Sequence, residues 1–128
     1  MSRDRGIRLQ NALAAYLTRW WPSAESAGSG RPGTDILGTP GVVWECKTAR
    51  EFRPLEWCRQ AKKHTAYFAV GNPVEWPVTV YWPDGLGAQS ADAAIAMMPL
   101  REMVQLLMQA GYGGTGLLGP ACAKEREA

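Results

Sequence analysis

The chain has 128 residues, of which 46% are hydrophobic and 20% are charged. This length and composition predict one globular domain and exclude an intrinsically disordered chain. No segment approaches the ~20 consecutive apolar residues that a transmembrane helix needs. No apolar signal segment follows the polar start Met1-Ser2-Arg3-Asp4-Arg5, so we expect a cytoplasmic protein without a membrane partner.

The cysteine and histidine content limits the kinds of metal site that the chain can form. Cys46, Cys58 and Cys122 form no Cys-x-x-Cys pair, which argues against a disulfide framework and against a structural zinc site. His64 is the single histidine, so a site built from several histidines is excluded.

The net charge of +2 conceals a division of the chain into a basic and an acidic half. Residues 1–65 carry a net charge of +5, and residues 66–128 carry a net charge of −3. A basic half indicates contact with nucleic acid, although chance clustering on a solvated surface is equally consistent with this charge.

The first half of the chain predicts a helix and three strands. Hydrophobic periodicity and turn residues give the order helix 3–20, strand 24–27, strand 34–38 and strand 42–48. Pro22 ends the helix. A Gly-rich loop occupies residues 28–33, and Thr39-Pro40-Gly41 forms the turn between the last two strands.

The second half predicts two helices and two strands, in the order helix 54–69, strand 77–82, strand 93–98 and helix 99–111. The inward face of the first of these helices is expected to carry Leu55, Cys58, Ala61, Thr65 and Phe68. The fold class is therefore a mixed α/β domain over residues 1–112, with residues 113–128 as a flexible C-terminal tail.

The chemically informative segment runs from Gly33 to Lys47. Side chains alternate along a strand, so Glu45 and Lys47 share one face while Trp44 and Cys46 take the other. Charged side chains on an apolar strand need an explanation, because buried charges are costly unless they are paired or bound to a metal.

The predicted hairpin brings Asp35 opposite Glu45. Directly opposed residues of a hairpin have Cβ atoms about 4.5–5.5 Å apart, where two carboxylates repel each other. A divalent cation between them makes the arrangement favourable, since Mg²⁺ takes one or two carboxylates together with waters and phosphate oxygens. Lys47 beside such an ion could orient or deprotonate an attacking water. The pattern predicts a metal-dependent phosphodiesterase site, whereas an exposed Glu–Lys pair is its simpler interpretation.

These segments resemble a known family of enzymes. The order helix, hairpin, Glu-x-Lys strand and helix resembles the PD-(D/E)XK nuclease superfamily, over roughly residues 3–82. Residues 27–36 (AGSGRPGTDI), followed by Trp44-Glu45-Cys46-Lys47, are most similar to the archaeal-type Holliday junction resolvases and their phage relatives. The resemblance implies a restriction-endonuclease-like core of helix, three strands, helix and strand, with a C-terminal strand and helix added to it.

The resemblance also implies roles for individual residues. Asp35, Glu45 and the Cys46 backbone carbonyl would bind Mg²⁺, with Mn²⁺ as a substitute, and Lys47 would act on the water. Ser29 occupies the place of a catalytic-loop serine in the resolvases. Gln60 resembles a glutamine found near the site in related nucleases.

The sequence departs from the family at two places. Thr34 precedes Asp35 where the family has proline. Gln10 stands where the resolvases carry a glutamate on the first helix. An amide oxygen can still coordinate a metal or its water, and in that role Gln10→Glu would tighten metal binding. Glu25 is an alternative source of the missing carboxylate.

Several basic residues are expected to contact DNA phosphates, although ordinary surface charge explains each of them equally well. They are Arg5, Arg8, Arg31, Arg53, Arg59, Lys62 and Lys63. We expect His64, one turn after Gln60, to be a surface or capping histidine.

The predicted function is a Mg²⁺-dependent endodeoxyribonuclease that hydrolyses phosphodiester bonds, with branched DNA as its substrate. Symmetric cutting of a four-way junction favours a homodimer, joined through residues after Gly71. If the chain is phage-encoded, its compartment is the host cytoplasm. The alternatives are a virus-type replication-repair nuclease or nickase acting on flaps or duplex, and a non-catalytic DNA-binding protein on a nuclease fold.

Overall fold

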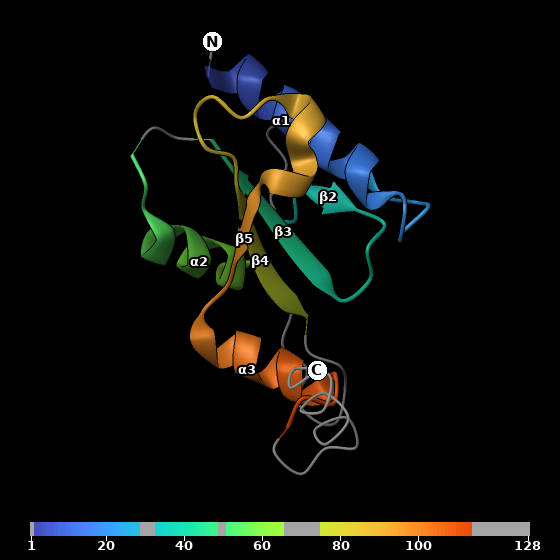
Figure 1. The fold of residues 1–128 in the computed structure, drawn as a ribbon, viewed down its shortest axis with the longest axis vertical. Helices are drawn as coiled ribbons and strands as arrows, with labels where there is room; N and C mark the ends of the chain where they lie inside the picture. Colours follow the sequence, from blue (N-terminus) through green and yellow to red (C-terminus); the bar gives the residue numbers. More distant parts are fainter. Residues whose placement is uncertain (1, 29–32, 49–50, 66–74, 114–128) are drawn as a thin grey trace, which may run out of the picture. The chain divides into compact units, whose positions relative to one another are not determined.

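Two parallel strands form the centre of the fold, β3 (Val42–Lys47) and β4 (Trp76–Tyr81). They pair along their whole length, from Val42 beside Trp76 to Lys47 beside Tyr81. The computed structural model describes residues 2–28, 33–48, 51–65 and 75–113 (Figure 1). It divides the chain into two units, Met1–Met98 and Pro99–Ala128, and β3 and β4 belong to the first.

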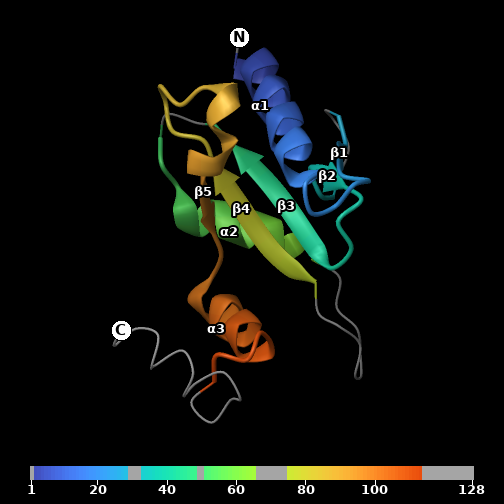
Figure 2. The same cartoon turned by 45° about the vertical axis from the view of Figure 1, so that its right-hand side comes forward.

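Helix α1 (Ser2–Leu17) covers one face of these strands (Figure 2). Leu9, Leu13 and Leu17 are buried, as their helical spacing predicts. They pack in one apolar cluster with Trp44 of β3 and Val80 of β4. The even-numbered side chains of β3 therefore face α1.

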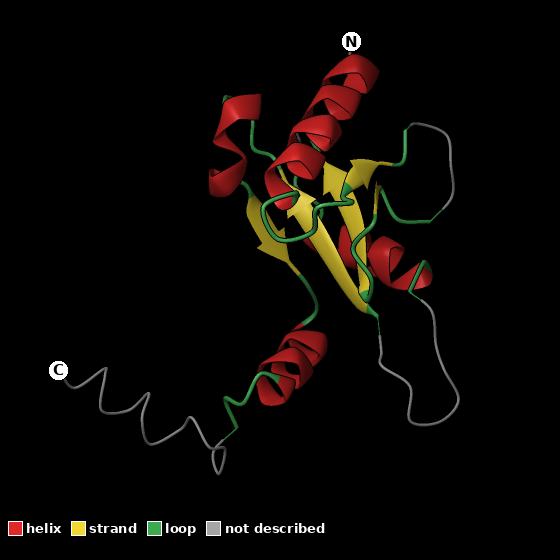
Figure 3. Ribbon diagram, turned by 90° about the vertical axis from the view of Figure 1, so that its right-hand side faces the viewer, coloured by secondary structure: helices red, strands yellow, loops and turns green. Residues whose placement is uncertain are grey.

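Helix α2 (Pro54–Lys63) covers the opposite face (Figure 3). It begins at Pro54, where a missing backbone N–H costs nothing because the first turn of a helix has no acceptor for it. Its buried residues are Trp57, Cys58 and Ala61. The prediction for Leu55 is wrong: this side chain is 64% exposed, and Trp57 takes the inward position through ring contacts with Phe52 and Tyr81. Phe68 lies outside the described residues.

The predicted hairpin between residues 34 and 48 takes a different form. Strand β2 (Ile36–Leu37) forms its regular ladder with β1 (Glu25–Ser26), as an antiparallel pair of two residues each. Gly38 follows with φ +83°, and a Cβ there would overlap the Ser23 carbonyl oxygen, so only glycine fits. The predicted register of Asp35 opposite Glu45 is wrong in detail, because the Asp35 N–H donates to the Trp44 carbonyl and β2 forms its ladder with β1.

The chain after β4 completes the first unit. A 3₁₀ segment, η1 (Ala88–Ala93), contacts α1, and β5 (Ile95–Met97) adds to β4 as an antiparallel edge strand. The fully buried Trp82 donates its indole N–H to the Gly87 carbonyl at 3.1 Å and so anchors this connection. The described fold is a mixed α/β structure with a small mixed sheet.

The second unit contains α3 (Leu100–Gln109). Its exposed apolar side chains follow helical spacing and are Leu100, Val104, Leu107 and Met108. Throughout the described ranges, every helix is too short or too polar to traverse a bilayer.

Candidate active site

The side chains of strand β3 lie alternately on the α1 face and on the α2 face of the sheet. Glu45 and Lys47 lie on the α2 face, as the alternation predicts, and Trp44 lies in the α1 cluster. Glu45 is only 6% exposed, although it is a carboxylate. The strand therefore holds an acidic group in a place where charge is costly.

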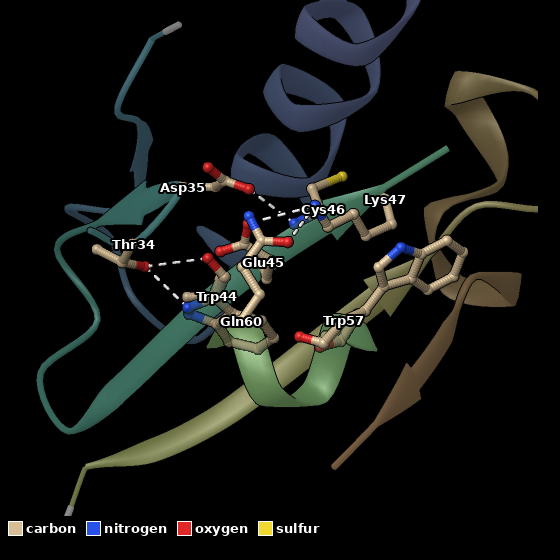
Figure 4. A network of polar contacts seen from close by, with 9 residues as sticks. Thr34, Asp35, Trp44, Glu45, Cys46, Lys47, Trp57 and Gln60 are labelled. Atoms are coloured by element: carbon tan, nitrogen blue, oxygen red, sulfur yellow. Dashed lines mark hydrogen bonds and ion pairs between the residues drawn. The ribbon is translucent and has the colours of Figure 1, made fainter. Parts of the chain in front are cut away.

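Asp35 reaches the free edge of β3 through its backbone and its side chain. Its N–H donates to the Trp44 carbonyl at 2.8 Å, and its Oδ2 accepts a hydrogen bond from the Cys46 N–H at 2.7 Å. The carboxylate is thus fixed at the backbone position next to Glu45 (Figure 4). Although the ladder register differs from the prediction, the two carboxylates still lie near each other.

Thr34 provides the link that a regular hairpin would otherwise supply. Its hydroxyl oxygen accepts hydrogen bonds from the Trp44 N–H at 2.8 Å and from the Ile36 N–H at 3.3 Å. A threonine that bonds to nearby backbone groups is a common alternative to ladder pairing. This role was not predicted from the sequence, although a threonine directly before Asp35 was its signal.

The carboxyl groups of Asp35 and Glu45 both have raised pKa values. Burial raises the pKa of Asp35 above its ordinary value of 3.8. The hydrogen bond from the Cys46 N–H opposes this rise most, followed by the charges of Lys47 and His64. Burial also raises the pKa of Glu45 above 4.5, and the negative charge of Asp35 raises it further. Within the described part of the chain, Glu45 Oε2 is buried and has no hydrogen-bond partner. The protein therefore leaves negative charge at this point without full compensation.

Lys47 and Gln60 extend the site towards α2. The Lys47 ammonium donates to Gln60 Oε1 at 2.8 Å and lies 3.6 Å from Glu45 Oε1. This network fixes the ammonium beside the carboxylate (Figure 4). Because the Gln60 oxygen is directed at Lys47, α2 positions the lysine without neutralising its charge.

Gln10 acts on the backbone that carries Asp35. Its amide nitrogen lies 2.9 Å from Ser26 Oγ, 2.9 Å from the Asp35 carbonyl oxygen and 3.3 Å from the Gly28 carbonyl oxygen. Gln10 thus donates to residues that precede and follow positions 29–32 in the sequence. Glu25, the alternative source of a carboxylate, is exposed and lies on the opposite face of β1 from Ser26, so it does not join Gln10.

The donor set fits a divalent cation that keeps several waters. The N–H and carbonyl of a strand residue point to the same side, so the Cys46 carbonyl shares the β3 edge with Asp35. Two carboxylates and one carbonyl satisfy the limited demand of Mg²⁺ for protein ligands. Among the described residues, no group of three or more His, Cys, Asp or Glu side chains could hold a metal. A metal here would therefore depend on this carbonyl, on water and on a ligand.

The other predicted site residues have varied surroundings. Ser29 and Arg31 lie outside the described residues. Arg5 directs its guanidinium to the carbonyls of Thr48 and Pro83, at 3.4 and 3.5 Å, and so connects α1 to the ends of β3 and β4. Arg53 is paired with Glu51 at 2.9 Å and with Glu56 at 3.2 Å.

The remaining basic residues differ in exposure. Arg8, Arg59 and Lys63 are exposed, whereas Lys62 is half-buried. His64 is exposed and forms the C-cap of α2, as the sequence predicts. Its spacing of four residues from Gln60 was the signal that it would lie on the same helix face as that residue.

Comparison of the chain with models of known protein families, with curated proteins and with solved structures found no match. The geometry of the site therefore carries the functional argument.

Proposed function

We propose that the chain is a Mg²⁺-dependent endodeoxyribonuclease of the PD-(D/E)XK type. The observation that carries this proposal is the buried, unpartnered Glu45 Oε2 beside the Asp35 carboxylate. A divalent cation held by these residues would relieve their repulsion and would give the orphan oxygen a partner. The order of α1, three strands, α2 and β4, with β4 parallel to β3, supports the family assignment.

The chain's own residues would divide the work of hydrolysis. Asp35, Glu45 and the Cys46 carbonyl would hold the ion, which supplies positive charge to the phosphate and acidifies water. Lys47, fixed by Gln60, would orient the attacking water and stabilise the charge that builds up on the phosphate. Gln10 would position Asp35 through its backbone carbonyl. Water attacks directly, without a covalent enzyme intermediate.

Branched DNA is the proposed substrate class, because the segments around Asp35 and Lys47 resemble those of Holliday junction resolvases. A flap or duplex nuclease uses the same site. A non-catalytic DNA-binding protein is a second candidate. Gln10 favours it, since the amide donates to backbone oxygens and supplies no carboxylate.

A cleavage panel tests the proposal. Four-way junction, flap, single-stranded and linear duplex DNA are incubated with the protein in Mg²⁺ and in EDTA. We expect the wild type to cut the junction in Mg²⁺ but not in EDTA. The variants Glu45→Gln and Asp35→Asn should lose this cleavage and should still bind DNA. Asp84→Asn, at an exposed carboxylate in the turn after β4, is the matched control and cuts normally.

Each other outcome has a defined meaning. Cleavage by Glu45→Gln at the wild-type rate would show that the site is misplaced. Flap or duplex cutting without junction cutting favours the nickase alternative. DNA binding with no cleavage of any substrate favours the non-catalytic candidate.

A further inference from the structure

A pocket of about 540 Å³ opens on the surface of α2. The described residues that line it are Glu56, Arg59, Gln60, Lys63 and His64. Their spacing of three and four residues places these side chains beside one another on a single helix face. The sequence predicts phosphate contacts for Arg59 and Lys63 separately and does not predict a shared pocket.

The charge of this pocket is positive. Arg59 and Lys63 are both exposed and carry positive charge, and the exposed His64 lies beside them. Glu56 is the one acid among the described lining residues, and its carboxylate is held by the Arg53 guanidinium at 3.2 Å. A concave surface with a net positive charge concentrates ions of the opposite sign, so the pocket favours an anion.

The pocket adjoins the candidate active site. Gln60 lines the pocket and also accepts the hydrogen bond of the Lys47 ammonium at 2.8 Å. Burial dominates the raised pKa of Asp35 and Glu45, but the positive charge of His64 reaches both carboxyl groups and opposes the shift. An anion in the pocket therefore lies one side chain away from Lys47.

We propose that this pocket binds the phosphate that flanks the scissile phosphate in the DNA strand being cut. Arg59 and Lys63 are its cationic contacts, and His64 is a further donor. A DNA strand carries one phosphate per nucleotide at a rise of about 3.4 Å, so a strand seated at Asp35 and Glu45 presents a second phosphate close by. Among the described lining residues none is Phe, Tyr or Trp, which favours a phosphate over a stacked base.

This inference rests on the proposed function, and phosphate neutralisation tests it. Junction oligonucleotides carry a single neutral methylphosphonate at successive positions around the mapped cut site. Binding is measured in EDTA, so it does not depend on turnover. We expect one flanking position to weaken wild-type binding by about tenfold, because a charge-assisted contact is lost there. The double variant Arg59→Ala/Lys63→Ala should show no weakening at that position.

Salt dependence gives an independent readout. In the double variant, the negative slope of log K against log salt concentration should become shallower by roughly 1–2, since each phosphate contact contributes about 0.9 to its magnitude. The control is Arg19→Ala/Arg101→Ala, which removes two exposed arginines elsewhere and should leave the methylphosphonate penalty unchanged. The charge-retaining exchange Arg59→Lys/Lys63→Arg should restore the penalty.

The failures are distinguishable. If the double variant keeps the wild-type penalty at every flanking position, the pocket is not a phosphate subsite, while cleavage by the wild type still supports the proposed function. If the wild type cuts no DNA in Mg²⁺, the proposed function fails and the inference fails with it.

Discussion

The hydrogen bonds of the Gln10 side chain indicate whether this residue binds metal or positions its neighbours. Its amide nitrogen donates to Ser26 Oγ and to two backbone carbonyls, those of Gly28 and Asp35. A glutamate would direct an acceptor at these oxygens, and neither carbonyl can donate in return. The geometry therefore favours a positioning role for Gln10 over a metal-binding role.

We expect Gln10→Glu to destabilise the protein by about 1–3 kcal/mol, because two carbonyls lose their donor and a charge is placed against them. Urea denaturation measures the change. Asn11→Asp makes the same change at an exposed neighbour on α1 and serves as the control. Unchanged stability together with tighter Mg²⁺ binding in Gln10→Glu would instead support a metal-binding role.

The raised pKa values of Asp35 and Glu45 predict a pH effect on the metal-free protein. Between their ordinary values, 3.8 and 4.5, and the raised native values, the native state binds more protons than the unfolded state. The contribution of these groups to stability therefore falls as the pH rises through that window. Burial is the main cause, so removal of one charge should relieve the cost.

Glu45→Gln should accordingly raise the Tm in EDTA at neutral pH, and this gain should shrink as the pH falls towards 4.5. Added Mg²⁺ should stabilise the wild type more than the variant, because the variant lacks one carboxylate. Thermal unfolding followed by circular dichroism measures both effects. A variant less stable than the wild type in EDTA would mean that the ion pair of Glu45 with Lys47 outweighs burial.

Among the elements, the segment before β2 is joined to β3 by the Thr34 hydroxyl as well as by the hydrogen bonds of Asp35. Thr34→Val keeps the shape of the side chain but leaves the Trp44 N–H without its acceptor. We expect a loss of about 1–3 kcal/mol in the free energy of unfolding. Cleavage should also slow, because the Asp35 backbone bonds to the same residue of β3.

Thr18→Val is the control for this substitution. Thr18 lies exposed just after α1 and also bonds to a backbone carbonyl, that of Ala15. A surface change of this kind is expected to alter stability by roughly 0.5 kcal/mol or less. Equal losses in Thr34→Val and Thr18→Val would show that the link to β3 contributes nothing specific.

Periodicity predicted the order of the α-helices and strands, but it did not predict η1, the end of α2 at Lys63 or how β2 and β3 are joined. The leucine spacing of α1 and the alternation along β3 each follow from which face is buried, and both are present in the sequence. The position of Asp35 beside β3 depends instead on a hydrogen bond to the Thr34 side chain. The two-residue alternation of a strand pattern does not reveal such a bond. Gln60 was found through the family resemblance, whereas its pocket requires the folded helix.

At the scale of the whole molecule, the exposed apolar face of α3 bears on the proposed homodimer. Leu100 is 77% exposed and Met108 is 57% exposed, which is unusual for side chains of this size. A second copy of the chain would bury such a face. A two-fold dimer would also supply the two cuts that a four-way junction requires.

Sedimentation in moderate salt should therefore show a dimer, and Leu100→Glu/Leu107→Glu should shift it to a monomer that still cuts flaps. Gln109→Glu adds charge at an exposed position on the opposite side of α3 and should leave the mass unchanged. A wild-type monomer at tens of micromolar would contradict this arrangement and favour the nickase alternative.

The hydrogen bond from the Cys46 N–H to Asp35 Oδ2, at 2.7 Å, gives the site its own spectroscopic reporter. The chain has three cysteines, so selective ¹⁵N labelling of cysteine reduces the amide spectrum to three signals. The proton of the Cys46 amide lies directly against the carboxylate that would take the metal. Its chemical shift therefore registers both protonation of Asp35 and arrival of a cation, and Asp35→Asn identifies the signal.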